Sequence, residues 1–359
     1  MKDTRIAFVG TGSIASAHAF ALSVLPYYYS ANDMSNILRV AAASPTQINR
    51  INFAKKYGFG LALTPEELWT RADLDINTVI ILSPNGAHYE HLLKAAKLES
   101  VKRIYLEKPI CASIHEEDSL KKWIENQRKD LFIQVGFQFL QMSAVRRALQ
   151  MKHMIGKPIH FHARYLHSGY LQKDYRLKRR TRLQPAPEGG ALADLGSHAL
   201  SLLVAFLGKN LEVISAAQSG SFSDVPNTSD LCTVLQLQER KSGAIGQMVA
   251  SRISAGAGDC LEFELRGTTG ALQLTTEKPD ELMVFSDTDK RGWIKINCGN
   301  DYAPISTFPS SNVSAGWLRS LIHAYFLFLG GTDELAFQPE LLHGLSVQKL
   351  IHQAVALMD

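Results

Sequence analysis

The sequence is poor in cysteine. Its 359 residues include only four, which lie far apart and form no Cys-x-x-Cys pair: Cys111, Cys232, Cys260 and Cys298. Such spacing is typical neither of a zinc site nor of a disulfide framework, so we expect a reducing compartment, the cytoplasm. His160 and His162 share a face of a predicted strand, but no carboxylate or cysteine lies at ligand spacing. We therefore expect no metal site.

Long apolar runs and a strong charge of one sign are also absent. The longest apolar stretch, near Ala199–Leu207, is interrupted by Ser201, whereas a membrane-spanning helix needs about 20 apolar residues. The first residues lead directly into a strand-like run, so we expect neither a membrane span nor a cleavable signal. Lys plus Arg number 38 and Asp plus Glu 34, which leaves a net charge of +4. This small excess gives no reason to expect a nucleic-acid partner.

Strand and helix signals alternate through the first third of the chain. Strand-like runs lie at 6–9, 38–43, 78–82, 103–106 and 132–137, with helix-like stretches between them. Alternation of this kind predicts an α/β domain in which helices cover both faces of a mostly parallel sheet. We place this first domain at residues 1–130.

The pattern changes after about residue 150, where strand-like runs separated by short turns dominate. This predicts a second, α+β domain at residues 131–359 with a large, mainly antiparallel open sheet. Helical patterns at 315–329 and 339–357 close the chain. The last of these helices is a candidate for packing back on the first domain.

A glycine-rich turn joins the first predicted strand to the first predicted helix. Its sequence, Gly10-Thr11-Gly12-Ser13-Ile14-Ala15, fits the pattern G-x-G-x-x-A. Gly10 permits the tight turn, Gly12 lets a pyrophosphate approach the backbone, and Ala15 allows close helix–strand packing. The helix N-terminus adds free N–H groups and partial positive charge. The order of strand, turn and helix predicts a Rossmann domain that binds NAD or NADP through residues 10–14.

The acidic residue that would bind the adenosine ribose at the end of the second strand is missing. Ser44-Pro45-Thr46 stands there instead, with Arg50 nearby. The hydroxyl groups of Ser44 and Thr46 and the charge of Arg50 suit a 2′-phosphate, which favours NADP over NAD.

Four further segments have the same order as the motifs of a known family. They are Ser83-Pro84-Asn85 with His88, Tyr105-Leu106-Glu107-Lys108-Pro109, Val135-Gly136-Phe137, and Gly189–His198 with its Asp-x-x-x-His pattern. With the glycine-rich turn they make five elements in register, and together they resemble the Gfo/Idh/MocA oxidoreductases. Within that family, Leu25–Tyr28 and Tyr170–Gln172 resemble the levoglucosan-dehydrogenase-like sugar and cyclitol dehydrogenases.

The resemblance implies which residues bind the cofactor and which do the chemistry. It adds Ser83, Pro84, Asn85, His88, Glu107 and Lys108 to the cofactor-binding residues, with Glu107 and Lys108 beside the nicotinamide. Oxidation of a secondary alcohol needs a base for the hydroxyl proton and a group that holds the developing alkoxide, and a buried lysine suits both roles. Asp194 and His198 are four residues apart on a predicted helix and share a face, where they can orient and deprotonate a hydroxyl group. Whether Lys108 or His198 is the base stays open.

The substrate side departs from the family pattern at two positions. Leu140 stands where the family often has Arg, and Ser201 where it often has Asp, so the substrate cannot be copied from a relative. Candidate substrate residues are Gln138, Tyr170, Gln172 and Arg176. A basic loop at 172–187 carries Lys173, Arg176, Lys178, Arg179, Arg180 and Arg182. It is either a solvated surface loop or a lid that recruits an anionic substrate such as a sugar phosphate or uronate.

The resemblance implies an NAD(P)-dependent dehydrogenase or reductase. It would transfer hydride between nicotinamide and a hydroxyl- or keto-bearing carbon of a sugar, sugar derivative or cyclitol. Two alternatives stay open: a redox-neutral glycosidase that retains NAD, and a non-catalytic sensor that keeps the fold and cofactor. The second domain is expected to bind the substrate and to form a homodimer or homotetramer through its sheet.

Overall fold

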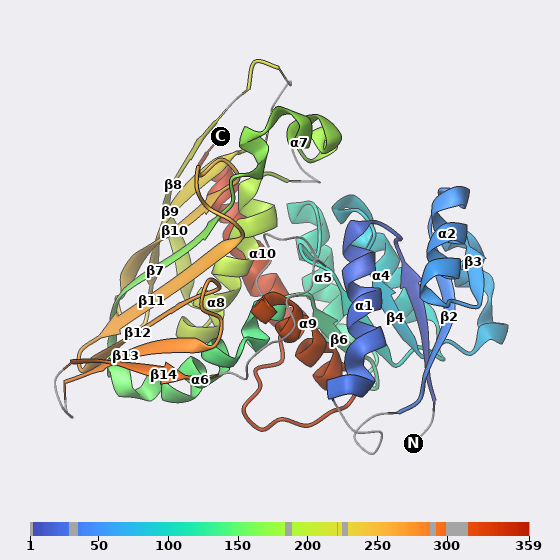
Figure 1. Ribbon diagram of the computed structural model, residues 1–359, viewed down its shortest axis with the longest axis horizontal. Helices are drawn as coiled ribbons and strands as arrows, with labels where there is room; N and C mark the ends of the chain where they lie inside the picture. Colours follow the sequence, from blue (N-terminus) through green and yellow to red (C-terminus); the bar gives the residue numbers. More distant parts are fainter. Residues whose placement is uncertain are drawn as a thin grey trace. The chain divides into compact units, whose positions relative to one another are not determined.

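Two separate β-sheets form the frame of the protein, whose computed structural model describes residues 3–28, 35–183, 189–220, 222–224, 229–287, 292–298 and 315–358 (Figure 1). Each sheet is the centre of one compact unit. The first unit consists of Met1–Gly136, Leu321–Glu334 and Gln338–Leu342, and the second of Phe137–Ser320, Leu335–Phe337 and His343–Asp359. The division falls after Gly136 instead of near residue 130, because the strand at 132–135 pairs within the first sheet.

The first sheet is parallel throughout and has the strand order β3-β2-β1-β4-β5-β6. Its strands are β1 (Thr4–Val9), β2 (Ile37–Ala43), β3 (Leu61–Leu63), β4 (Thr78–Ile81), β5 (Arg103–Leu106) and β6 (Phe132–Val135). The central runs Ile6–Val9 and Val79–Ile81 are fully buried, as expected where helices cover both faces. The order of the strands reverses between β1 and β4, and ligands of such sheets bind at the carboxyl ends of the strands beside this point.

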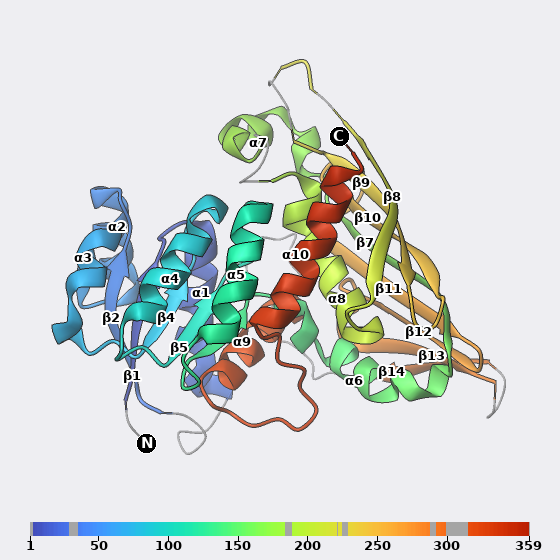
Figure 2. The same cartoon turned by 180° about the vertical axis from the view of Figure 1, so that it is seen from behind.

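Helices occupy both faces of the first sheet, with α1 on one face and α4 and α5 on the other (Figures 1 and 2). The helices of this unit are α1 (Ser13–Tyr28), α2 (Gln47–Tyr57), α3 (Pro65–Thr70), α4 (His88–Lys97), α5 (Ile114–Asn126) and most of α9 (Ala315–Phe328). The start of α3 has a complete N-terminal cap. Thr64 accepts a hydrogen bond from the Glu67 N–H, and the Glu67 carboxylate accepts one from the Thr64 N–H, which forms a capping box before Pro65.

The second sheet has eight strands in the order β14-β13-β12-β11-β7-β10-β9-β8, and every pair is antiparallel except β7 with β10. The strands are β7 (Pro158–Leu166), β8 (Leu211–Ser219), β9 (Cys232–Glu239), β10 (Ile245–Ser251), β11 (Cys260–Gly267), β12 (Gly270–Thr275), β13 (Glu281–Ser286) and β14 (Gly292–Asn297). Helices α8 (Ser197–Leu207) and α10 (Leu341–Ala356) lie along one face of this sheet (Figures 1 and 2). Phe206 of α8 stacks on Phe263 of β11, with ring centroids 4.4 Å apart. The predicted mainly antiparallel sheet is confirmed.

Two local predictions need correction, and one helix was missed. The segment expected to be a loop contains helix α7 (Lys173–Lys178) and a short turn at Arg180–Leu183, while residues 184–188 lie outside the described residues. The helix predicted to carry Asp194 and His198 begins with a π-helical turn, η7 (Leu192–Gly196), before α8. Helix α6 (Ser143–Met151) was not predicted, although its apolar residues Ala144, Val145 and Ala148 follow a helical period and are buried.

Two general features complete the description. Within the described ranges, no helix is both long and apolar enough to cross a lipid bilayer. All four cysteines are free thiols, and Cys111 and Cys260 are buried.

Candidate functional site

The glycine-rich turn has the shape that a pyrophosphate requires. Gly10 has a φ of +108°, and a Cβ there would lie 2.3 Å from the carbonyl oxygen of Leu82, so another residue would strain the turn and collide with the backbone. A Cβ at Gly12 would meet nothing within 4 Å, which leaves open space beside the backbone. Helix α1 follows with no acidic residue in its first turn. The turn therefore offers N–H groups and a positive helix end to an anion.

The end of β2 carries hydroxyl groups and an arginine in place of a carboxylate. Ser44 is buried, and Thr46 precedes α2 without capping it through its side chain. The Arg50 guanidinium donates to the carbonyl oxygens of Ser44 (3.3 Å) and Pro45 (3.0 Å), which holds it over the end of the strand. Its Nε is buried without a hydrogen-bond partner within the described part of the chain. The structure therefore brings together the three residues that the sequence linked to a 2′-phosphate.

The segment after β4 is tied to the segment after β5 by one histidine. His88 is buried, and its Nδ1 lies 2.6 Å from the Pro109 carbonyl oxygen while its Nε2 lies 2.8 Å from the Ser83 carbonyl oxygen. The Ser83 hydroxyl contacts Nδ1 of His91 at 2.9 Å. Because both ring nitrogens of His88 face backbone oxygens, its ring fixes these two loops against each other. Pro84 and Asn85 lie between the anchored positions, at the start of a short 3₁₀ turn, Asn85–Ala87.

Lys108 follows β5 and is half-buried, while the neighbouring Glu107 is buried. One carboxylate oxygen of Glu107 accepts from the Lys108 backbone N–H at 3.1 Å, and the other lies 3.0 Å from Nε2 of His18. Burial acts to raise the pKa of Glu107, but the His18 hydrogen bond and nearby positive groups outweigh it, and the pKa lies below its usual value. Glu107 is therefore a buried carboxylate fixed by two donors.

The second unit gathers polar groups at one edge of its sheet. Strands β7 and β10 are parallel and β11 is antiparallel to β7, so the residues after β7 and β10 meet the residues before β11. His167, Arg252 and Asp259 occupy these positions, with Nε2 of His167 3.9 Å from a carboxylate oxygen of Asp259. The π-helical turn η7 brings Asp194 to the same edge, where it meets Arg252. Such turns are frequent at functional sites.

Asp194 forms an ion pair with an arginine that the sequence reasoning did not identify. Arg252 is 1% exposed, and its Nη2 donates to Asp194 Oδ2 at 2.9 Å while its Nη1 donates to the Arg182 carbonyl oxygen at 2.7 Å. Its guanidinium also lies 4.9 Å from the ring centroid of Tyr170. The Arg252 guanidinium fixes the position of the carboxylate, so Asp194 is suited to orient a hydroxyl group by accepting its hydrogen bond. The sequence signal for Arg252 is a charged residue directly after a buried strand.

His198 is buried among aromatic rings at the start of α8. Its ring centroid lies 5.0 Å from that of Phe139, 5.8 Å from Tyr165 and 6.1 Å from Phe137. Burial, followed by the charges of Asp259 and Asp194, raises the pKa of Tyr165 well above its usual value, so its hydroxyl group stays protonated. The histidine and the tyrosine thus place a titratable ring and a permanent O–H donor near each other.

The four candidate substrate residues have different environments. Gln138 and Tyr170 are buried, whereas Gln172 is exposed at the start of α7. Arg176 donates to the carbonyl oxygens of Tyr170 and Leu171, both at 2.8 Å, and pairs with Asp224 at 2.6 Å. Through these contacts the Arg176 guanidinium holds the turn before α7 in place, which is a structural role.

The other basic residues of this segment remain at the surface. Lys173, Lys178, Arg179, Arg180 and Arg182 are exposed. The Arg179 guanidinium lies 4.0 Å from the ring centroid of Tyr175, and Arg182 Nη1 lies 3.4 Å from Asp194 Oδ2. Arg182 therefore connects the exposed basic group to the ion pair of Asp194 with Arg252.

The two departures from the family pattern also have clear environments. Ser201 is buried, and its hydroxyl group contacts Nε2 of His343 at 3.0 Å. Burial lowers the pKa of His343 to about 4, so it is neutral at pH 7. Leu140 is buried as well. At both positions the chain buries a neutral side chain.

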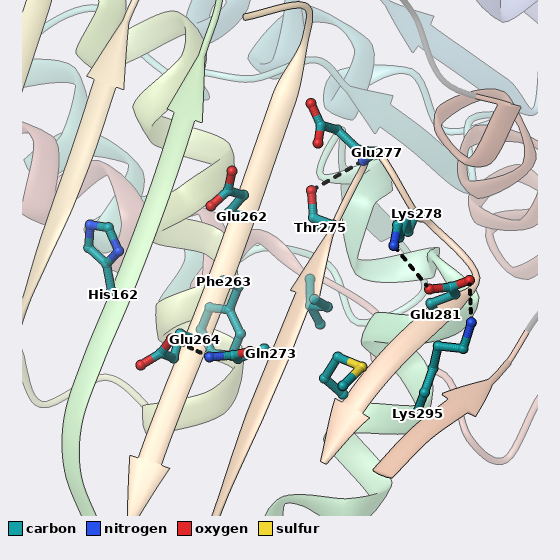
Figure 3. Close-up of a pocket in the computed structure, with 12 residues that line it drawn as sticks. His162, Glu262, Phe263, Glu264, Gln273, Thr275, Glu277, Lys278, Glu281 and Lys295 are labelled. Atoms are coloured by element: carbon teal, nitrogen blue, oxygen red, sulfur yellow. Dashed lines mark hydrogen bonds and ion pairs between the residues drawn. The ribbon is translucent and has the colours of Figure 1, made fainter. Parts of the chain in front are cut away.

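A cavity of about 390 Å³ lies elsewhere, on the face of the second sheet opposite α8 (Figure 3). Several of its charged residues have partners: Glu264 accepts from Gln273 at 2.6 Å, and Glu281 lies 3.1 Å from Lys295 and 3.7 Å from Lys278. The described residues that line it include none of the predicted site residues. This cavity is a feature of the open sheet face and not of the candidate site.

Comparisons with known proteins agree with this architecture. Residues 4–137 match the family described as an oxidoreductase family with an NAD-binding Rossmann fold, and residues 142–273 match the GFO/IDH/MocA C-terminal domain. Levoglucosan dehydrogenase of Pseudarthrobacter phenanthrenivorans is 24% identical over 329 residues, which cover 83% of this chain and 81% of the relative. A solved structure of levoglucosan dehydrogenase in complex with NADH and levoglucosan has a TM-score of 0.82 at 22% identity, covering 99% of this chain and 97% of the other.

Two relatives from Bacillus subtilis match parts of the chain. The scyllo-inositol 2-dehydrogenase (NAD(+)) is 28% identical over 226 residues, covering 60% of this chain and 59% of the relative. Glucose-6-phosphate 3-dehydrogenase is 26% identical over 201 residues, covering 55% and 52%. Both units of the fold, their motifs and these matches lead to one conclusion: the chain belongs to the Gfo/Idh/MocA family of NAD(P)-dependent oxidoreductases.

Proposed function

We propose that this oxidoreductase transfers hydride between a nicotinamide cofactor and a hydroxyl- or keto-bearing carbon of a sugar, sugar derivative or cyclitol. The observation that carries the proposal is the position of Lys108. It follows β5 in the same sheet whose β1 ends in the glycine-rich turn, and a buried carboxylate anchors its backbone. The relatives named for levoglucosan, scyllo-inositol and glucose 6-phosphate support a polyhydroxylated substrate.

Each residue then has a separate task. The nicotinamide ring, when bound, supplies the hydride acceptor or donor. Lys108 Nζ and the His198 ring are the two groups that can take the hydroxyl proton. Asp194, held in place by Arg252, accepts a hydrogen bond from the substrate and orients it. Tyr165 keeps its proton and serves as a donor.

We also propose that the chain accepts NADP in preference to NAD. The support is the end of β2, where Ser44, Thr46 and Arg50 replace the carboxylate that would repel a 2′-phosphate. Calorimetric titration with each cofactor tests this, with Arg50→Ala as the variant. A clear preference of the unmodified protein for NAD, or an unchanged NADP affinity in Arg50→Ala, contradicts the proposal.

An anionic substrate is the third part of the proposal. Arg179, Arg180 and Arg182 are exposed, and Arg182 contacts Asp194. A cationic surface of this kind raises the local concentration of a sugar phosphate or uronate, and the effect weakens with salt. The relative that acts on glucose 6-phosphate supports this choice.

Assembly into a homodimer or homotetramer is the fourth part. The open face of the second sheet exposes Ile245 at 55% and Trp293 at 41%, beside paired charges of both signs. Such a mixed face suits self-association. Sedimentation velocity measures the mass in solution, and a monomer at all accessible concentrations contradicts this part.

One experiment tests the central proposal. Sugars, sugar phosphates and cyclitols are offered with NAD and NADP while the absorbance of the reduced nicotinamide is followed. We expect reduction with at least one polyol and free exchange of cofactor. Tightly retained NAD with no accumulation of NADH would instead favour the redox-neutral glycosidase, and cofactor binding without turnover on any substrate would favour the sensor.

A further inference from the structure

Three buried side chains form a hydrogen-bonded series that leads to Lys108. His18 of α1 is 0% exposed, its Nδ1 contacts the hydroxyl group of Tyr325 from α9, and its Nε2 lies 3.0 Å from Glu107 Oε1. Glu107 Oε2 in turn accepts from the Lys108 backbone N–H. Residues that are far apart in the sequence thus form one connected path that ends at the backbone of Lys108.

Only one tautomer of a neutral His18 gives both of its hydrogen-bond partners a matching donor or acceptor. An ionised carboxylate only accepts, so His18 Nε2 must carry the proton that faces Glu107. A neutral imidazole then has an acceptor at Nδ1, and the Tyr325 hydroxyl group supplies the donor. Tyr325 therefore selects the tautomer of His18 that can hold Glu107.

The residues around Glu107 hold its carboxylate in one position. A Cβ at Gly136 would lie 2.7 Å from Glu107 Oε1, so the absence of a side chain there leaves room for the carboxylate. The titratable groups that face Glu107 are His18 from α1, His88 from α4, Lys108 beside it, and Tyr105 and Tyr325, whose buried hydroxyl groups stay protonated because burial raises their pKa values. Tyr105 and Tyr325 stack with ring centroids 4.8 Å apart, and His18 meets both rings edge-on.

We propose that His18 is a positioning residue for Lys108, which it fixes through the Glu107 carboxylate, with Tyr325 setting the tautomer of His18. The proposal rests on the proposed function, since that function assigns Lys108 to proton transfer. A carboxylate released by His18 can rotate away from the Lys108 N–H, and the lysine then loses its fixed position. Small displacements of a catalytic group are costly in rate because the reacting atoms must be aligned.

The kinetic test compares four variants. His18→Phe keeps an aromatic ring and removes both nitrogens, whereas the amide of His18→Gln can still donate to Glu107 from about the position of Nε2. We expect kcat to fall about 10- to 100-fold in His18→Phe, with little change in the KM for the cofactor, and to recover largely in His18→Gln. Tyr325→Phe keeps the ring stack and should give an intermediate loss.

Tyr105→Phe is the matched control. It belongs to the same stack, but its hydroxyl group has no hydrogen-bond partner among the described residues, so its removal should leave kcat unchanged. The pH profile separates positioning from a general packing defect. Loss of the His18 donor favours the protonated form of Glu107, so activity in His18→Phe should fall at a higher pH on the acid side than in the unmodified protein. A packing defect alone would lower kcat without shifting the acid side of the pH profile.

An infrared titration of Glu107 makes the test independent of the substrate. The carbonyl band of a protonated carboxyl group is followed against pH, with Glu107→Gln as the subtractive reference. It should emerge at a higher pH in His18→Phe than in the unmodified protein and in His18→Gln. A protein that turns over no substrate refutes the proposed function, while the infrared titration still tests the role of His18. Equal titration and equal kcat in His18→Phe and the unmodified protein, or equal losses in His18→Phe and His18→Gln, overturn the proposal.

Discussion

Replacement of Arg252 by methionine should destabilise the second unit strongly. Methionine fills much of the space of the arginine side chain but removes the donors to Asp194 and to the Arg182 carbonyl oxygen, together with the contact to Tyr170. Loss of one partner of a buried ion pair costs about 3–5 kcal/mol. The Asp194 side chain is 22% exposed, so water partly solvates the carboxylate that is left behind. We therefore expect a loss near the lower limit, about 3 kcal/mol.

Urea unfolding followed by intrinsic fluorescence measures this loss as a shift of the midpoint at unchanged slope. The matched control is Arg240→Met, because Arg240 also pairs with a carboxylate, Glu212 at 2.5 Å, but is 60% exposed. It should show little measurable change. In the double variant with Asp194→Asn, the loss should be smaller than the sum of the single losses, since both partners of the same ion pair are removed together. Equal losses in Arg252→Met and Arg240→Met would refute the argument from burial.

Three further predictions concern the cofactor turn, the lysine and acid stability. Gly12→Ala should leave thermal stability nearly unchanged, because the added Cβ would contact no other atom. It should weaken cofactor binding about tenfold or more, as measured by calorimetry. Equal affinity would show that no phosphate approaches this backbone. Lys108→Ala should abolish turnover while the cofactor dissociation constant stays nearly the same, and loss of cofactor binding with the fold preserved would instead indicate an anchoring role. His343 has a pKa of about 4 in the folded protein, whereas an unfolded histidine takes up its proton below about pH 6.5. Between these pH values only the unfolded chain binds the proton. The free energy of unfolding should therefore fall from about pH 6.5 to about pH 4, by up to about 1.4 kcal/mol per pH unit. His343→Gln should flatten that part of the dependence in urea unfolding at several pH values, and an unchanged slope would contradict the burial of a neutral ring.

The sequence predicts those parts of the fold that depend on local pattern. The apolar strands of the first sheet and the glycine-rich turn could be predicted, because each is set by residues a few positions apart. The short strand β3 was not predicted, because three residues carry no period. The π-helical turn before α8 was also missed, since its hydrophobic pattern resembles that of an ordinary helix.

The partners of the candidate site residues were less accessible to sequence reasoning. Lys108, Asp194 and His198 belong to motifs with fixed spacing, so they could be named. Arg252 and His18 act through contacts with residues 58 and 89 positions away, Asp194 and Glu107. A single sequence gives no signal for such pairs, because it shows which residues are charged but not which strand ends meet.

The segment Leu321–Glu334 has a consequence for the order in which the chain folds. It completes the first unit, where Gln134 donates to the Ala324 carbonyl oxygen at 3.0 Å and Arg103 donates to that of Phe328. Synthesis proceeds from the N-terminus, so a nascent chain that has just emerged through Gly136 still lacks Tyr325, the residue that selects the tautomer of His18. The cofactor-binding half therefore reaches its final core only after the whole second sheet has been translated. An N-terminal fragment that ends at Gly136 would expose the apolar surface that α9 covers.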